Sequence, residues 1–277
     1  MIIGMHATTQ ISELRLEIAV CTYGADGIRR LAKSHLPEVE GVAYVVSWQC
    51  SDGCEVPEAL SSRADVAVFR SEGKGLSRNR NSALALCSAP LVLIADDDVD
   101  YDAEGLARAL DTTEAHPEHG IFTFMVTRPD QPCYPAEPTV LGRHKPKGYW
   151  VSSVEIMLRP AKTGDLRFDT RFGLGSGEFG CGEEELFVLT AQRRGVGAMF
   201  IPIVIGHHDN RSTGSKATPG ILRAHGCLIA LEYGMPSCAP RLVLKGWRVW
   251  RAGNAPLFKA LKYIFAGAWQ SRLISAK

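Results

Sequence analysis

The sequence predicts an α/β fold in which a mostly parallel sheet is flanked by helices on both faces. Short apolar, β-branched runs alternate with segments of helical periodicity in the first half of the chain. This alternation is typical of parallel strands joined by helices. The run 91–95 is apolar at every position, as expected for a strand buried on both faces. A chain of 277 residues suffices for one large α/β domain or two small ones.

The first half of the chain is expected to alternate strands with helices between turns marked by Gly and Pro. The predicted strands are 16–23, 42–48, 64–69, 91–95 and 121–126. The predicted helices are 28–36, which would end before Pro37, a helix that begins around Ser77, and 102–115. The apolar side chains expected to face inward from the last two helices are Leu76, Ala83, Leu84, Leu86, Leu106 and Leu110.

The second half is less regular. Residues 128–148 are rich in Pro, Gly and charge and are expected to form an exposed, mobile loop, and 149–159 is strand-like. The glycine-rich segment 168–181 must be a loop of unusual backbone geometry, a place where ligands often approach the chain. A helix over 182–195, with Leu186 and Leu189 inward, and a strand over 199–205 complete the predicted catalytic domain, residues 1–214.

A basic, amphipathic helical extension is predicted for residues 215–277. Residues 1–213 carry 21 Lys and Arg against 29 Asp and Glu, a net charge of −8, whereas 214–277 carry ten basic residues and one acid, a net charge of +9. A basic tail indicates an anionic partner surface, but the acidic body argues against nucleic acid. Helical spacing places one set of apolar side chains on one side, namely Leu257, Leu261, Ile264, Phe265, Ala268 and Trp269, and Lys259, Lys262 and Gln270 on the other.

Two interpretations of this extension stay open. Residues 240–277 contact a membrane surface, or the helices pack on the catalytic domain or form a homodimer contact. The amino terminus lacks the basic start and long apolar run of a signal peptide, and no apolar stretch reaches the roughly 18 residues of a spanning helix. The eight cysteines are scattered, as expected of reduced thiols. We therefore expect a cytoplasmic protein, with peripheral contact at the inner face of the membrane if the first interpretation holds.

Three groups of polar residues could carry chemistry. Asp96, Asp97 and Asp98 follow the buried strand directly, and such a cluster either binds a divalent cation or forms a solvated turn that caps the next helix. The basic loop before that strand either binds phosphate oxygens or is a solvated face of a helix. The spacing of its glycines and lysine matches neither a P-loop nor the dinucleotide-binding fingerprint. Its basic residues are Lys74, Arg78 and Arg80.

The third group lies later in the chain. Glu183, Glu184 and Glu185 open a helix, where carboxylates either complement the helix dipole or include a general base. His207 and His208 follow a strand, so one of them either completes a metal site with the aspartates or is structural.

In combination, these segments resemble the nucleotide-sugar glycosyltransferases of family 2, which have the GT-A fold. The resemblance covers roughly residues 16–214. Asp96 and Asp98 match the family's Asp-x-Asp motif. The Gly-Leu-Ser-x-x-Arg-Asn segment is matched by Gly75, Leu76, Ser77, Arg80 and Asn81, and the segment leading into the catalytic acidic pair by Phe168, Asp169, Phe172, Gly173, Glu183 and Glu184. The later histidine with Ser/Thr is matched by His208, Ser212 and Thr213.

The resemblance implies an inverting sugar transfer from a nucleoside diphosphate to a hydroxyl of a glycan or lipid-linked acceptor, in cell-surface polysaccharide synthesis. It implies that Glu184, or else Glu183, is the base and that Asp98, Asp96 and His208 bind Mn²⁺ or Mg²⁺. The implied nucleotide-sugar contacts are Thr22, Tyr23, Gln49, Lys74, Ser77, Arg80, Asn81, Asp96 and Asp97. The chain departs from the family at two positions. Near Gln49 the family often has an aspartate that contacts the nucleobase, and at the position of Glu184 it commonly has Asp.

Two other classes of protein remain as alternatives. Phosphatases of the haloacid dehalogenase type also have Asp-x-Asp after a strand, although usually close to the first strand of the chain. A non-enzymatic module that binds nucleotide sugars would carry the same residues without turnover.

Overall fold

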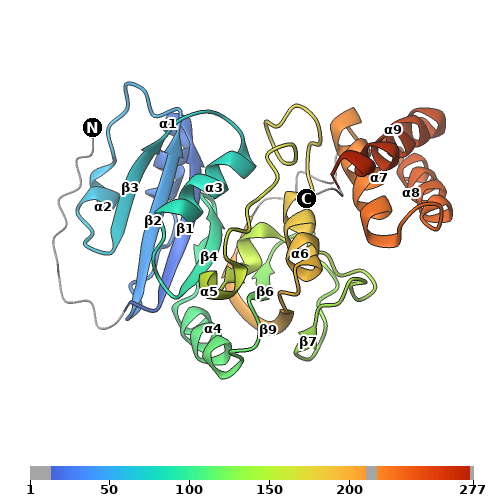
Figure 1. Ribbon diagram of the computed structural model, residues 1–277. Coiled ribbons are helices and arrows are strands. Elements are labelled where there is room, and N and C mark those ends of the chain that lie inside the picture. The colour runs from blue at the N-terminus through green and yellow to red at the C-terminus, as the bar shows by residue number, and fades with distance from the viewer. Residues whose placement is uncertain (1–13, 210–216, 275–277) are drawn as a thin grey trace.

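The computed structural model describes residues 14–209 and 217–274, and it shows a twisted sheet with a group of helices at one end (Figure 1). Nine strands within the described residues form this sheet. They are β1 Leu16–Tyr23, β2 Val42–Gln49, β3 Val66–Ser71, β4 Leu91–Asp96, β5 Asp100–Tyr101, β6 Ile121–Thr127, β7 Thr139–Val140, β8 Ile156–Leu158 and β9 Ala198–His207. Their order in the sheet is β3-β2-β1-β4-β8-β6-β9-β5, and β7 also pairs with β9.

The long pairings in this sheet are parallel, as predicted. β1 pairs in parallel with β2 and β4, β2 with β3, and β6 with β9. The short strand β8 joins the two parallel groups, since it lies between β4 and β6 and runs antiparallel to both. The carboxyl ends of β1, β2 and β4 therefore meet at one edge, where a crevice for ligands is expected.

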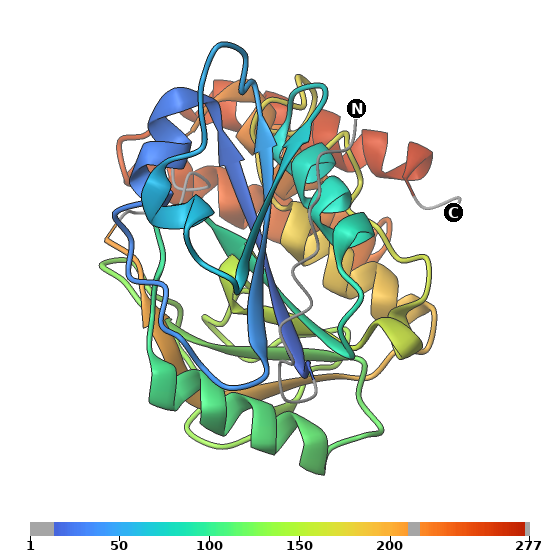
Figure 2. The same ribbon diagram turned by 90° about the vertical axis from the view of Figure 1, so that its left-hand side faces the viewer.

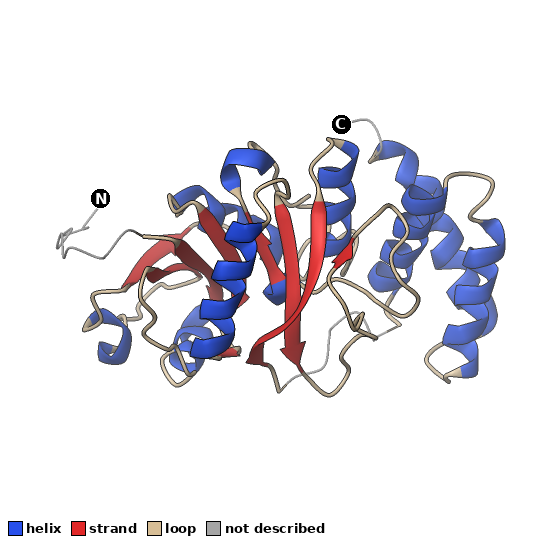
Figure 3. Cartoon of the chain, turned by 90° about the horizontal axis from the view of Figure 1, so that it is seen from below, coloured by secondary structure: helices blue, strands red, loops and turns tan. Residues whose placement is uncertain are grey.

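Helices cover both faces of the sheet, which forms a curved central layer (Figure 3). Alternate side chains of β1 point to different cores: Ile18 packs in the same cluster as Leu106 of α4, and Ala19 in the same cluster as Ala83 of α3 and Phe187 of α6. Helix α4 is the green helix along the bottom of Figure 2. The helices are α1 Gly24–Leu31, α2 Glu58–Ser61, α3 Leu76–Leu86, α4 Ala103–Ala115, α5 Pro160–Thr163, α6 Glu183–Arg193, α7 Pro219–Tyr233, α8 Ala239–Arg251 and α9 Leu257–Gln270.

Several predicted boundaries are wrong for identifiable reasons. The helix expected at 28–36 begins earlier, at Gly24, and ends at Leu31, because the chain then turns so that the backbone N–H of His35 donates to Asp100 (2.6 Å). The third strand lies at Val66–Ser71 instead of 64–69.

The two irregular segments also differ from expectation. The strand-like stretch 149–159 is a strand only at β8, because residues Ser153–Glu155 form a 3₁₀ turn. The loop 128–148 contains β7 and buries Arg128 and Leu141.

The predicted apolar stripe of α3 is confirmed in part: Ala83 is buried, and Leu76 and Leu84 pack against its core cluster. The rest of the inward face is polar, which was not predicted. The buried residues of α3 are Ser77, Asn79, Arg80 and Ala83, whereas Leu86 is exposed. Burying three polar side chains is favourable only when each has hydrogen-bond partners, and the partners lie in the site described below. In α4 and α6 the predicted inward residues are confirmed, since Leu106, Leu110, Leu186 and Leu189 are buried.

The three carboxy-terminal helices pack on the sheet domain through α7. Ala224, Cys227 and Leu231 of α7 share a core cluster with Leu186 of α6 and with Phe172. Helix α9 lies close against α7, because glycines stand where the helices approach. A Cβ on Gly226 would lie 1.8 Å from the carbonyl oxygen of Ile264, and one on Gly267 1.9 Å from that of Arg223. Packing on the domain that contains the sheet, one of the two interpretations, is thus observed for α7.

The predicted division of the last helix is wrong. Ile264 and Ala268, which were expected on the same side as Trp269, are buried, while Phe265 and Trp269 are exposed. The reason is that α9 packs on both α7 and α8, which cover the side bearing Ile264 and leave the aromatic side uncovered.

Three further expectations concern the boundary between the two predicted domains, the cysteines and membrane-spanning helices. The predicted boundary at residue 214 and the motif residues Ser212 and Thr213 lie outside the described residues. All eight cysteines are free thiols. Of the helices that the structure describes, none is both long and apolar enough to cross a bilayer.

Candidate active site

The predicted polar residues gather where β1, β2 and β4 end. In the register of the sheet, Tyr23 lies opposite Gln49, and Cys21 opposite Asp96. The structure therefore brings the end of the acidic strand beside Thr22, Tyr23 and Gln49, as expected for the carboxyl edge of a parallel sheet.

Arg80 is the centre of this site. Its guanidinium donates to Oε1 of Glu183 (2.7 Å), to both carboxylate oxygens of Asp96 (3.1 and 3.2 Å) and to Oγ of Ser153 (2.8 Å). Its side chain is only 2% exposed. Burial alone would lower the pKa of Arg80, but the charges of Asp96 and Glu183 outweigh it and raise the pKa, so the group stays cationic.

The placement of Arg80 changes its predicted role. The guanidinium is buried and already hydrogen-bonded to three side chains, so it is not free to bind phosphate as predicted. Its bonds instead join Asp96, the last residue of β4, to Glu183, which opens α6. Arg80 thereby fixes the acidic strand end relative to the glutamates.

Asp97 also turns inward. It accepts hydrogen bonds from Thr22 Oγ1 (2.6 Å) and from the guanidinium of Arg30 (2.6 and 2.9 Å). Burial raises the pKa of Asp97, although Thr22 and Arg30 oppose the shift. Thr22 and Asp97, both predicted to contact the nucleotide sugar, thus bind each other and tie α1 to the strand ends.

Asp98 and His208 form the part of the site that fits a metal ion. Nε2 of His208 lies 3.1 Å from Oδ1 of Asp98, and both side chains are partly exposed. A carboxylate oxygen beside an imidazole nitrogen is a donor set that suits Mn²⁺, and Mg²⁺ is commonly held by one or two carboxylates together with substrate phosphates. His207 points elsewhere, since its ring nitrogens lie 2.8 Å from Thr127 Oγ1 and 2.8 Å from Asp209.

The glycine-rich loop closes over the start of α3. Ser77 Oγ donates to the carbonyl of Phe172 (2.6 Å), and the amide of Asn81 both donates to and accepts from the backbone of Phe168 (2.8 Å each). Gly173 has φ +96°, and a Cβ there would lie 3.0 Å from Glu183 Cδ, so only glycine allows this approach. Ser77 and Asn81 therefore position the loop.

Two predicted contacts, Lys74 and Tyr23, have exposed side chains, and a third, Gln49, has a buried amide without a partner among the described residues. Lys74 is exposed and lines a 110 Å³ cavity together with Gly75. Tyr23 is 52% exposed. Gln49 is buried, and its Nε2 has no hydrogen-bond partner among the described residues. An orphaned buried amide is costly, which is consistent with a site that a ligand completes.

Glu184 differs from its two neighbours. Glu183 binds Arg80, and Glu185 accepts from the backbone N–H of Val151 (2.9 Å) and pairs with Lys145. Glu184 instead lines a 590 Å³ pocket, and its buried Oε2 has no partner among the described residues. Burial, and then the charge of Glu183, raise the pKa of Glu184 well above that of an ordinary glutamate.

This pocket, hereafter the Glu184 pocket, lies between the sheet domain and the carboxy-terminal helices. Residues of the loop before β8 and of α6 line one side, including Trp150 and Glu185, and residues of α7 and α8 line the other, including Leu228, Tyr233 and Lys245. It is large enough for a small ligand or one or two sugar rings.

Sequence reasoning missed two residues of the site. Asn79 donates to the carbonyl of Thr22 (3.0 Å) and accepts from Ser47 Oγ (2.6 Å). Ser153 completes the bonds of Arg80. Neither residue stands in a pattern that distinguishes it from any surface Asn or Ser, but polar residues at positions 77, 79 and 80 of one helix could have indicated a polar inward face.

A buried ion pair lies behind the site. Arg128 donates to Glu155 (2.5 Å), as does the hydroxyl of Tyr134 (2.5 Å). Burial raises the pKa of Glu155 to about 7, although Arg128 and Tyr134 oppose the shift. The protonated form of Glu155 is therefore more favoured in the folded than in the unfolded chain.

This shift predicts a pH-dependent effect of Glu155→Gln. A raised pKa in the folded state means that the stability contributed by Glu155 is present below pH 4.5 and is lost as the pH rises to about 7. As the pH is raised from 5 to 8, wild type loses this contribution and Glu155→Gln does not. The free energy of unfolding of the variant minus that of wild type should therefore increase by about 1–3 kcal/mol between these two pH values. Urea unfolding at the two pH values measures this. An effect of the substitution that is the same at both would contradict the shift.

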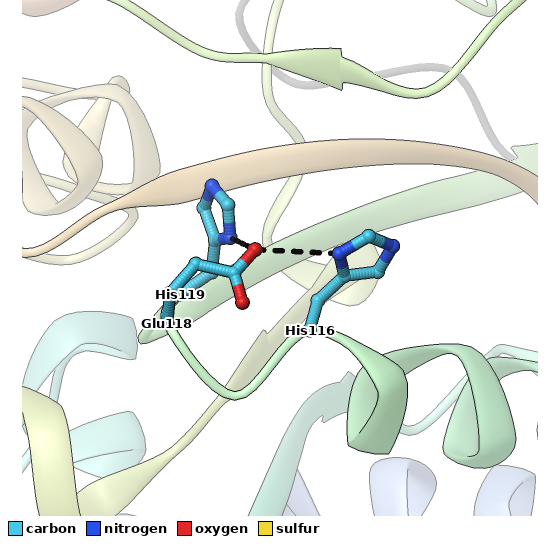
Figure 4. A group of neighbouring side chains, drawn as sticks. All are labelled: His116, Glu118 and His119. Carbon is cyan, nitrogen blue, oxygen red and sulfur yellow. Dashed lines mark hydrogen bonds and ion pairs between the residues drawn. The ribbon is translucent and has the colours of Figure 1, made fainter.

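A second group of possible metal ligands lies elsewhere. His116 and His119 both direct Nδ1 at Oε1 of Glu118 (3.3 and 2.9 Å) in the turn after α4 (Figure 4). This turn precedes β6, whereas the site lies where the parallel strands end. Two imidazoles that share one carboxylate account for the arrangement, so we assign it no part in the site.

Comparison with known proteins shows the fold. No family model and no curated protein sequence matches the chain. The crystal structure of S. aureus TarS residues 1–349 matches with a TM-score of 0.58 and 15% identity, covering 94% of this chain and 92% of that chain. The same region in complex with UDP-GlcNAc gives 0.57 and 14%, with the same coverage. The predicted α/β class and the resemblance to the GT-A fold are therefore confirmed at the level of the fold.

Proposed function

We propose that the chain is a metal-dependent, inverting glycosyltransferase that uses a nucleoside-diphosphate sugar. The observation that carries this proposal is the pair of bonds from Arg80 to Asp96 and Glu183. They hold the strand end that bears Asp98 beside the helix that bears Glu184, so that a donor site and a candidate base adjoin. The likeness in fold to TarS, which was crystallised with UDP-GlcNAc and with UDP, supports a nucleotide-sugar donor.

In this proposal the donor lies over the ends of β1, β2 and β4. Asp98 and His208 would hold Mn²⁺ or Mg²⁺ together with phosphate oxygens of the donor. Asp96, the other predicted ligand, is bound by Arg80 and would have to reach the ion from that position. The ion, when bound, supplies positive charge against the negative charge that develops on the departing diphosphate. Lys74 would contact phosphate oxygens from its exposed loop, and the unpartnered amide of Gln49 would bind a polar group of the nucleotide.

The acceptor would enter the Glu184 pocket. Its hydroxyl attacks the anomeric carbon from the face opposite the diphosphate, forming a new C–O bond while the bond to the phosphate oxygen breaks. The diphosphate leaves with the electron pair, and the proton of the hydroxyl passes to Glu184. A raised pKa makes the ionised form of Glu184 a stronger base than an ordinary carboxylate. The mixed lining, with apolar residues such as Trp150 and Leu228 beside charged ones such as Lys245, supports a glycan or lipid-linked acceptor. In this proposal the acceptor belongs to cell-surface polysaccharide synthesis on the cytoplasmic side.

Product analysis separates this proposal from the two alternatives. Incubation with a panel of nucleotide sugars and Mn²⁺ should release a nucleoside diphosphate. Release of free phosphate would favour a phosphatase of the haloacid dehalogenase type, and binding without any turnover would favour a nucleotide-sugar-binding module.

A thermal-shift experiment tests the metal site separately. At about 100 times its Kd a ligand stabilises a protein by about 2.7 kcal/mol, so a matching nucleotide sugar with Mn²⁺ should raise Tm by roughly 5 °C. The Asp98→Asn variant should lose the part of the shift that depends on Mn²⁺. Asp165→Asn, at a side chain that is 95% exposed, is the matched control and should keep it. An unchanged Mn²⁺ effect in Asp98→Asn would remove Asp98 from the metal site.

A further inference from the structure

Helices α8 and α9 each leave an apolar stripe uncovered. Helix α8 buries Leu242 and Gly246, and α9 buries Ala260, Ile264, Gly267 and Ala268. The opposite sides carry large apolar side chains that are 37–83% exposed. They are Val243, Leu244, Trp247 and Trp250 on α8, and Leu257, Phe258, Phe265 and Trp269 on α9.

The two stripes lie on the same side of the helix pair. A Cβ on Gly246 of α8 would lie 2.4 Å from Leu261 of α9, and these two residues are equally far from the turn that joins the helices, as in an antiparallel hairpin. With 3.6 residues per turn, the mean direction of the stripe is displaced from this contact by roughly 90° on α8 and roughly 40° on α9, in the same sense along each helix. Because the helices run in opposite directions, the stripes face the same way. Helix α7 packs on the other side of α9.

The charge around these stripes is uniformly basic. Within 217–274 the single acidic residue is Glu232, which lies 3.5 Å from His144. The guanidinium of Arg272 lies 3.7 Å from the ring centre of Trp269, and that of Arg251 5.1 Å from Trp247. The exposed basic residues of the two helices and the residues after them are Arg241, Arg248, Arg251, Lys259, Lys262 and Arg272.

We infer that this surface, hereafter the aromatic face, docks onto a bilayer that contains anionic lipids. Trp and Phe rings lie at the boundary between acyl chains and headgroups, and Lys and Arg around them reach the headgroup phosphates. A second copy of the chain fits less well, because two such faces would bring together basic residues without opposing carboxylates. The inference rests on the surface alone and does not depend on the proposed activity.

Flotation of the full chain with vesicles tests the inference. The chain should float with vesicles of phosphatidylcholine and phosphatidylglycerol (7:3), and much less with phosphatidylcholine alone. Replacing Trp250, Phe258 and Trp269 together with Ser should abolish flotation. The matched control is Phe69→Ser/Val140→Ser, which changes exposed apolar residues of β3 and β7 and should float like wild type. Thermal unfolding checks that both variants are folded.

A charge variant tests the electrostatic part. Each basic residue near an anionic surface contributes about 1 kcal/mol, so Arg248→Gln/Lys259→Gln/Lys262→Gln should bind the anionic vesicles roughly 100-fold more weakly. Wild-type protein that does not float with anionic vesicles would overturn the inference. So would equal flotation of wild type and the Ser variant, or a wild-type dimer that the Ser variant converts to monomer without any vesicle binding.

Discussion

Replacing Glu184 with Gln should lower turnover by about 10²–10⁴-fold while the dissociation constant of the nucleotide sugar stays nearly unchanged. The substitution keeps the size of the side chain and removes its ability to take a proton. Because Glu184 lines the Glu184 pocket and binds no other described side chain through Oε2, few structural contacts are lost. Single-turnover kinetics and equilibrium binding of the donor measure the two effects.

Two comparisons make this prediction specific. Glu178→Gln, at an exposed glutamate of the glycine-rich loop, should leave turnover unchanged. The pH profile gives a second readout: burial raises the pKa of Glu184, so the acidic limb of kcat/KM should lie above pH 4.5 in wild type and disappear in Glu184→Gln. Normal turnover in Glu184→Gln would exclude the residue as the base and leave Glu183 as the remaining choice.

Replacing Arg80 with Met should destabilise the fold by about 3–5 kcal/mol, the largest stability effect expected in the chain. The guanidinium compensates Asp96 and Glu183 at the same time and is 2% exposed. Its removal leaves a carboxylate that is 7% exposed, Glu183, without its cation. Urea unfolding at pH 7 measures the loss.

Matched variants separate this charge effect from the loss of side-chain packing. Arg78→Met, on the exposed side of the same helix, should change the free energy of unfolding by no more than about 0.5 kcal/mol. In the double variant Arg80→Met/Glu183→Gln, part of the loss should be recovered, since the unpaired charge is gone. A stability of Arg80→Met equal to that of wild type would contradict the central place given to this residue.

The sequence was most informative where the core decides the structure. The buried strand at 91–95, the inward residues Leu106 and Leu110 and the glycine-rich loop could all be predicted, because apolar periodicity and glycine content reflect local requirements. The polar part of the inward face of α3 could not, since its residues are buried only because partners such as Ser153 and Glu183 come from distant segments.

The site shows the same limit. The motif residues could be located, but their individual roles depend on side-chain directions. Asp97 and Asp98 are adjacent in sequence, yet one turns inward to Thr22 and Arg30, and the other lies beside His208. The predicted division of the last helix into an apolar and a polar side is wrong for a related reason. The positions of α7 and α8, and not the spacing of apolar residues along α9, decide which apolar residues are covered.

The measurement that tests the account most directly is a crystal structure with Mn²⁺ and the nucleotide sugar that gives the largest thermal shift, with the metal located by its anomalous scattering. The account predicts one manganese peak at bonding distance from Asp98, in contact with the diphosphate, and the sugar directed toward Glu184. A nucleotide bound away from the ends of β1, β2 and β4, or manganese at His116 and His119 with none at Asp98, would contradict it.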